Sequence, residues 1–92
     1  MDELDDLIRS TVEAMNKRFD SHELILHLAQ HNQRHYIKAL RETEGNRPFK
    51  KLHARIGRRV KALSDQLGID GQPWKSADIF GQASDCVLYT KR

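Results

Sequence analysis

The side chains of this 92-residue sequence with the clearest chemical role are cations near its middle. No acidic residue occurs between Glu44 and Asp65, whereas seven Lys and Arg residues do. Ammonium and guanidinium groups bind phosphate and carboxylate oxygens through charge and hydrogen bonds, so this segment suits a polyanion. The seven candidate binding residues are Arg47, Lys50, Lys51, Arg55, Arg58, Arg59 and Lys61.

The same segment has the periodicity of an amphipathic helix. Apolar residues recur at steps of three and four, and at about 100° per residue they share one narrow face. Like-charged pairs such as Lys51–Arg55 and Arg55–Arg59 lie one turn apart and repel each other unless a counter-charge is bound. The apolar residues are Phe49, Leu52, Ile56, Val60, Leu63 and Leu67. We therefore expect nucleic acid at the basic face. A solvated surface helix and an acidic protein partner, including the chain's own N-terminal helix, are the alternatives.

The net charge of +3 conceals a strong asymmetry along the chain. Residues 1–23 hold seven acids and three bases, whereas residues 24–64 hold ten bases and two acids. The positive field is therefore concentrated in the middle, where a docking polyanion would feel it most.

Other reactive side chains have simpler interpretations. His27, His31 and His35 are spaced by four residues, which would suit a metal on one helix face. No Cys lies near them and Asn32 interrupts the expected helix, so we expect exposed or groove-facing histidines and no metal. Cys86 is expected as a small core residue of a strand. Trp74 could stack on a base, but a Trp beside a proline at a strand entrance favours a lid over the core.

Enzymatic activity is not expected. The sequence contains no phosphate-cradling loop, zinc knuckle, nucleophile elbow or paired-carboxylate motif. No cofactor is implied.

The first helix is predicted over residues 3–18. Acids crowd its first turn, where the helix dipole favours them. These acids are Asp2, Glu3, Asp5 and Asp6. In this interpretation the chain is one domain. Residues 19–92 form its core, and residues 1–18 form an appended packing or dimerisation element.

Local signals predict two further helices. Asp20, followed three residues later by Glu23, matches a capping box that starts a helix over residues 21–31. An apolar gap favours a break at Asn32 before a third helix over 33–43. One uninterrupted helix through both segments is the alternative.

A loop over residues 43–47 separates these helices from the basic one. Gly45 suits a C-cap, Asn46 an N-cap, and Pro48 the first turn of a helix over residues 48–67. Gly68 ends this helix. Gly57, inside it, costs up to ~1 kcal/mol relative to Ala and suggests the close approach of another backbone, from protein or phosphate.

The chain then changes to strand character. Two short strands are predicted over residues 74–80 and 86–90, joined by a turn over 81–85. Because this turn contains Asp85 and no Lys or Arg, we expect the hairpin to bind phosphate less than the basic helix does.

In element order, three helices followed by a β-hairpin, residues 19–92 resemble a winged helix-turn-helix. The fold class expected is mainly α with a small β-hairpin, a winged-helix-like three-helix core plus an extra N-terminal helix. The resemblance implies that residues 21–31 and 33–43 are its first two helices and 48–67 its recognition helix, which commonly enters the major groove. The wing tip would be residues 81–85.

These observations predict a small DNA-binding module, either a transcriptional regulator or a phage or plasmid accessory protein. Duplex DNA is favoured over RNA because aromatic residues are scarce. A homodimer through the N-terminal helix is a further expected partner. The alternative is a protein-protein interaction module whose basic helix docks an acidic partner or its own N-terminal helix. A single Cys and an acidic start without a signal-peptide pattern favour the cytoplasm, and no apolar run suits a membrane.

Overall fold

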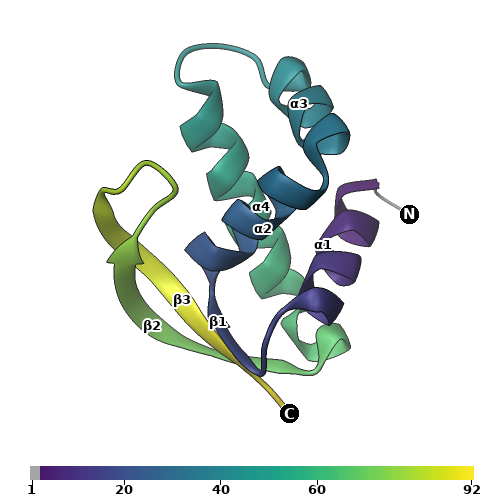
Figure 1. The fold of residues 1–92 in the computed structure, drawn as a ribbon, viewed down its shortest axis with the longest axis vertical. Coiled ribbons are helices and arrows are strands. Elements are labelled where there is room, and N and C mark those ends of the chain that lie inside the picture. Colours follow the sequence, from purple (N-terminus) through teal and green to yellow (C-terminus); the bar gives the residue numbers. More distant parts are fainter. Residues whose placement is uncertain (1–2) are drawn as a thin grey trace.

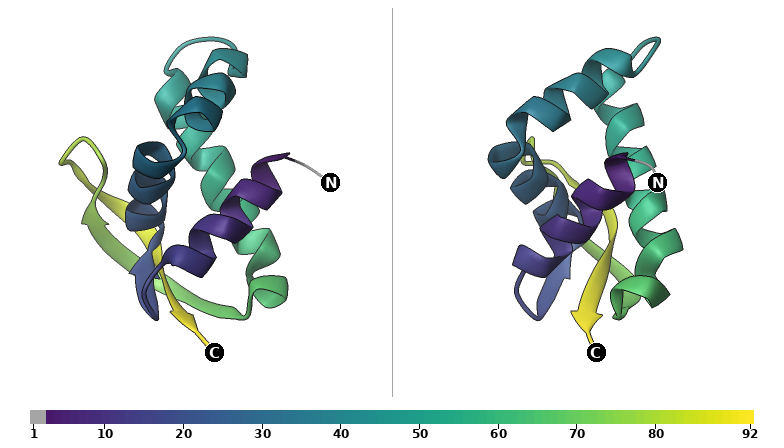
Figure 2. Two further views of the ribbon diagram at one scale, coloured as in Figure 1. Left: turned by 45° about the vertical axis from the view of Figure 1, so that its right-hand side comes forward. Right: turned by 90° about the vertical axis from the view of Figure 1, so that its right-hand side faces the viewer.

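The computed structural model describes residues 3–92 and combines four helices with a three-stranded antiparallel sheet. The first two residues, and with them Asp2, lie outside the described part. The sheet has the strand order β1-β3-β2, and the helices lie on one side of it (Figures 1 and 2). The elements are α1 (Glu3–Ala14), β1 (Arg18–Asp20), α2 (Ser21–His31), α3 (Gln33–Glu42), α4 (Pro48–Leu67), β2 (Ile69–Ala77) and β3 (Ala83–Lys91). None of the helices described is long and apolar enough to cross a membrane.

Helix α1 belongs to the core of the molecule. Its apolar face is buried in the same cluster as residues of the other three helices and the sheet. Within the described residues, α1 therefore packs on the rest of the fold, and a homodimer through this helix stays a prediction. The buried residues of α1 are Leu4, Leu7, Ile8, Thr11 and Val12.

Helix α1 ends at Ala14, earlier than predicted, because the chain extends into β1. Phe19 of this strand is buried, and its ring lies against Tyr89 of β3 with centroids 5.8 Å apart. The strand leads directly into α2, and the predicted capping box is confirmed. The Asp20 carboxylate accepts from the Glu23 amide at 2.8 Å, and Glu23 accepts from the Asp20 amide at 3.2 Å.

The predicted break between the second and third helices is also confirmed, since Asn32 separates α2 from α3. The start of α4 differs from the prediction. Its N-cap is Arg47, not Asn46, and Arg47 adopts a left-handed backbone with φ 57°. Pro48 occupies the first turn and Gly68 ends the helix, both as predicted.

Four members of the predicted apolar stripe of α4 are buried, namely Leu52, Ile56, Val60 and Leu63. Leu67 is half-buried. Phe49 is the exception, because 42% of its surface is exposed at the end of α4 that extends beyond the core.

The hairpin is longer than predicted. β2 and β3 pair in register from Ile69 with Lys91 to Ala77 with Ala83, so the turn falls at residues 78–82. Trp74 is 47% exposed, which contradicts its expected role as a core lid. Trp74 is the cross-strand partner of Cys86, so the two side chains share one face of the hairpin. Cys86 is half-buried, less enclosed than the core residue expected.

Candidate nucleic-acid interface

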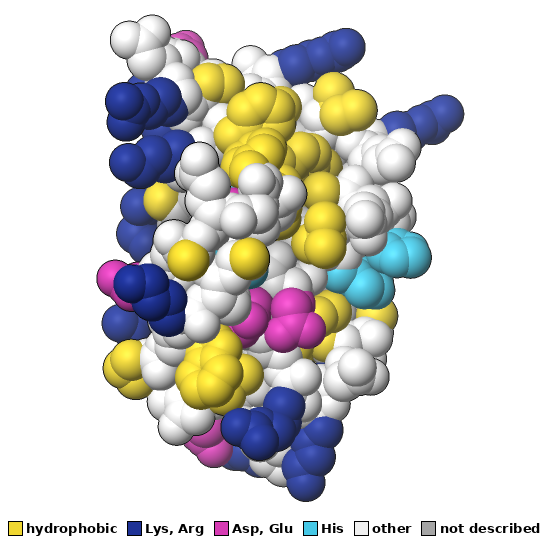
Figure 3. All heavy atoms as spheres, turned by 60° about the vertical axis from the view of Figure 1, so that its left-hand side comes forward, with side chains coloured by type: hydrophobic (Ala, Val, Ile, Leu, Met, Phe, Trp, Pro, Cys, Tyr) yellow, Lys and Arg dark blue, Asp and Glu magenta, His cyan; other side chains and the backbone are white. Residues whose placement is uncertain are grey.

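A groove of about 740 Å³ lies between α4 and the hairpin. Helix α4 forms one wall, the 78–82 turn and the start of β3 form the other, and α2 contributes Ser21, His22 and Ile25. Figure 3 turns this side of the molecule forward. Lys and Arg side chains form a column along one edge, beside a patch of hydrophobic side chains.

Four of the seven predicted binding residues line this groove. We call them the groove-side cations: Arg47, Lys50, Arg58 and Lys61. All four are exposed. Within the part of the chain that the structure describes, none of them forms an ion pair with a carboxylate. Their charge is therefore available to a ligand.

The other three predicted residues follow the adjacent face of α4, at steps of four. We call Lys51, Arg55 and Arg59 the back row. Arg59 donates two hydrogen bonds to the Asp5 carboxylate, at 2.9 and 2.7 Å. The Arg59 hydrogen bonds, together with the positive charges of Arg59, Arg9 and Arg55, hold the pKa of Asp5 below its usual value despite partial burial.

The remaining back-row residues also face the chain itself. Lys51 donates to the backbone carbonyl of Glu44 at 3.0 Å and thereby fastens the α3–α4 loop. Arg55 lines a small pocket of about 70 Å³ with residues of α1 and α3. The basic face thus has two parts, one directed toward α1 and one toward the groove.

Two small residues and His53 line the groove on α4 between Lys50 and Arg58. Ala54 and Gly57 line the groove one turn apart. A Cβ added at Gly57 would meet no atom within 4 Å, so no protein backbone of the described chain approaches it. The approach of an external backbone, from protein or phosphate, stays a prediction.

The opposite wall carries two carboxylates with local structural roles. Asp78 Oδ1 accepts from the backbone amides of Phe80 at 2.9 Å and Gln82 at 3.0 Å, which holds the turn. Asp85 faces Lys75 across the hairpin. The groove is lined by four Lys and Arg residues and two Asp residues, so its net charge is positive.

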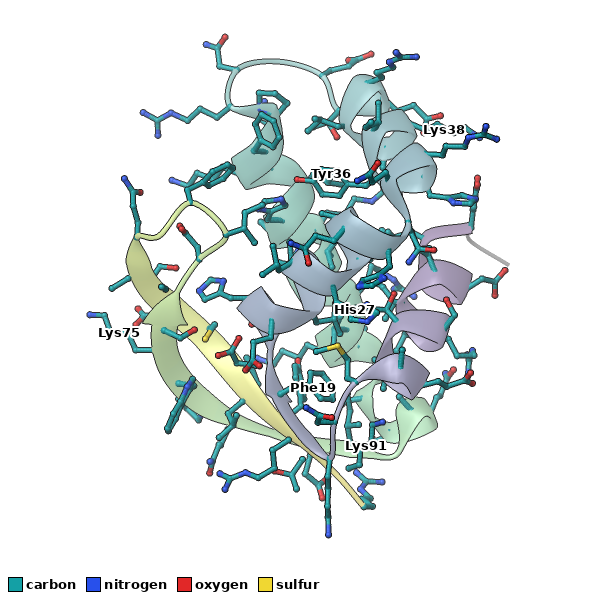
Figure 4. The ribbon with its side chains drawn as sticks, viewed as in Figure 1. Phe19, His27, Tyr36, Lys38, Lys75 and Lys91 are labelled. Atoms are coloured by element: carbon teal, nitrogen blue, oxygen red, sulfur yellow. The ribbon has the colours of Figure 1, made fainter. Side chains whose placement is uncertain are left out.

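An aromatic cluster closes the end of the groove near the start of α4. The Phe80 ring stacks on His53 with centroids 6.1 Å apart and meets the edge of Phe49 at 5.6 Å. The Tyr36 hydroxyl lies 2.6 Å from His53 Nε2, and Figure 4 shows Tyr36 extending from α3 toward α4. Burial lowers the pKa of His53, and the nearby charge of Asp78 only partly opposes it.

Sequence analysis missed this cluster, since Phe49 was assigned to the core and Phe80 to a strand. The one available signal was the position of Phe49, at the start of the apolar stripe and next to the loop.

The remaining histidines do not converge on a site. His27 and His31 stack with centroids 4.1 Å apart, whereas His35 lies on α3 beside Glu3. Across residues 3–92, no three His, Cys, Asp or Glu side chains are arranged to hold a metal ion. His22 Nε2 lies 2.9 Å from Ser84 Oγ on the groove wall, but no described carboxylate hydrogen-bonds this imidazole as a catalytic triad would require.

Comparison with models of protein families, with curated proteins and with solved structures finds no match for this chain.

Proposed function

We propose that this protein is a small DNA-binding module in which α4 docks on a duplex and the adjacent groove receives the sugar-phosphate backbone. One observation carries the proposal. Four exposed cations, none paired with a carboxylate within residues 3–92, line a groove whose α4 wall also contains His53 and the small residues Ala54 and Gly57. Cations supply the affinity for phosphate, and small residues let the backbone come close.

The order of elements supports a winged-helix-like arrangement for this role. Helices α2, α3 and α4 precede a hairpin, as in the winged helix-turn-helix that the sequence resembles. In this arrangement α4 is the recognition helix and the 78–82 turn is the tip of the wing. A transcriptional regulator or a phage or plasmid accessory protein would use such a module.

The start of α4 adds to the positive field. Its first turn contains no acidic residue, and no side chain caps its amides. The positive end of the helix dipole therefore acts together with Arg47 and Lys50 on a phosphate. The left-handed backbone of Arg47 costs about 1–2 kcal/mol, and such conformations cluster at functional sites.

A mobility-shift titration tests the proposal. It compares a random duplex, single-stranded DNA and RNA at two salt concentrations. We expect binding of the duplex that weakens steeply as salt rises, because counterions are released from the phosphates. A flat salt response, or no duplex binding at low salt, would refute the proposed function.

A protein-interaction module is the second candidate, and the Asp5–Arg59 pair favours it. In this pair a cation of α4, Arg59, already binds a carboxylate of the acidic helix α1 within the chain. An acidic peptide that binds the groove-side cations with the affinity of a duplex at matched salt would favour this candidate.

A further inference from the structure

The aromatic cluster beside the groove combines exposure with a fixed geometry. Phe49 is 42% exposed and Phe80 is 59% exposed, although their rings touch. The Phe80 ring lies roughly parallel to His53, with centroids 6.1 Å apart and an interplanar angle of 20°. With more than half of its surface in solvent, Phe80 has room for another flat ring to stack.

The cluster is held in place from both sides. On the helix side, the Tyr36 hydroxyl lies 2.6 Å from His53 Nε2 and fixes the imidazole beside Phe80. On the hairpin side, Asp78 accepts the Phe80 amide, and Gly81 closes the turn with φ 82° and a hydrogen bond to the Asp78 carbonyl at 3.0 Å. A ring that is ordered before binding loses little conformational entropy when a ligand arrives.

The charges around the cluster indicate the kind of ligand. Arg47 and Lys50 are exposed and line the same groove as His53 and Phe80. A flat apolar surface next to unpaired cations complements a nucleotide, because the base stacks while its phosphate meets the cations. An apolar protein segment would leave these cations without a partner.

A purely structural role would be to clasp the hairpin onto α4. In that role the Phe80 side chain would be buried. Its neighbour Ile79 does pack against the core. Phe80 instead has the highest exposed fraction among the large hydrophobic residues that the structure describes.

We propose that Phe49, His53 and Phe80 form a stacking site for an unpaired nucleobase, so that the protein prefers duplex DNA that carries a single-stranded extension or a bulge. This inference rests on the proposed function, which places the adjoining duplex on the groove-side cations. The paired bases of an intact duplex cannot reach the site, because they are stacked on each other.

Fluorescence anisotropy with three DNA molecules tests the site: a blunt duplex, the same duplex with a short thymidine extension, and one with an abasic extension of equal length. The abasic extension keeps the phosphates and removes the bases. We expect the thymidine extension to bind about tenfold more tightly than the abasic one. Phe80→Ala should abolish this difference, whereas Phe80→Trp should retain it.

A matched control is Leu26→Ala, which truncates an apolar residue of α2 with 41% exposure. This variant should keep the preference for thymidine. A readout without any variant is the fluorescence of 2-aminopurine in the extension, which the wild-type protein should quench when the base stacks.

Each remaining outcome has a definite meaning. Equal binding of the thymidine and abasic extensions, with duplex binding intact, overturns the stacking site and leaves the proposed function standing. A thymidine preference that survives in Phe80→Ala also overturns it, since the preference then does not come from this ring. No binding of any of the three molecules at low salt overturns both.

Discussion

Replacing Arg58 and Lys61 together by Gln removes two of the four groove-side cations and leaves the apolar side of α4 unchanged. Each neutralised phosphate on duplex DNA contributes about −0.9 to the slope of log K against log salt. One phosphate per groove-side cation gives a slope of about −3.6 for the wild-type protein and about −1.8 for the double variant. Between about 50 and 200 mM salt, affinity should fall about 150-fold in the wild type and about 12-fold in the variant.

The matched control removes the same charge from the other part of the same helix. Arg55→Gln with Arg59→Gln should keep the slope near about −3.6, because the back row faces α1. The control should also unfold more easily, since it frees the Asp5 carboxylate from its two hydrogen bonds. Anisotropy titrations of a labelled random duplex at five salt concentrations give the slopes, and urea unfolding gives the stabilities.

Two results would refute the assignment of the site. An unchanged slope in Arg58→Gln with Lys61→Gln would exclude the groove. Equal losses of slope in both double variants would mean that the whole basic face binds DNA, and the wild-type slope should then approach about −6.3 for all seven cations.

Three further predictions concern single residues. Gly57→Ala should raise the free energy of unfolding by up to ~1 kcal/mol, because the added Cβ meets no atom within 4 Å, yet weaken duplex binding. Urea unfolding and anisotropy measure both effects, and unchanged affinity would exclude a backbone at this position. Asp5→Asn should cost about 1 kcal/mol at pH 7, as expected for a half-buried bidentate pair. Because the pKa of Asp5 is lowered in the folded state, the Asp5–Arg59 pair stabilises the folded state at pH values above the unfolded pKa of 3.8. The difference in free energy of unfolding between wild type and Asp5→Asn should therefore shrink as the pH falls below that value. Burial lowers the pKa of His53, so on acidification the unfolded chain binds a proton near pH 6.5 before the folded chain does, and the folded state loses stability. His53→Gln removes this titrating group and should therefore reduce the loss of stability at low pH. Melting temperatures from pH 8 to pH 5 should therefore fall more steeply in the wild type, and parallel curves would contradict the burial of this imidazole.

Local signals predicted most of the helical framework. Signals that end or start a helix act within a few residues, so the helix boundaries that they set could be predicted from sequence. These signals are the capping box at Asp20, Pro48 in a first turn and the C-cap Gly68. Strand β1 was missed because three residues cannot display an alternating pattern, and its partner β3 lies about 70 residues away in the chain. Trp74 was misplaced because its burial depends on which face of the hairpin the helices cover.

The division of the basic face could not be predicted from sequence either, because it depends on contacts between residues far apart in the chain. The Asp5–Arg59 pair joins residues 54 positions apart, and it forms only because the apolar face of α1 packs beside α4. Periodicity grouped the seven cations correctly on the exposed side of one helix. It gave no information on which neighbour lies beside each of them.

This division also determines how a duplex can approach in the proposed function. Glu3, Asp6 and Glu13 of α1 are exposed, so a phosphate backbone that approaches from that side meets carboxylates. On the hairpin side, Asp78 is engaged by backbone amides, and the cations of the groove have no partner among the described residues. The acidic helix therefore has two effects in this proposal: Asp5 pairs with Arg59 of the back row, and the exposed carboxylates of α1 disfavour the approach of a duplex from that side.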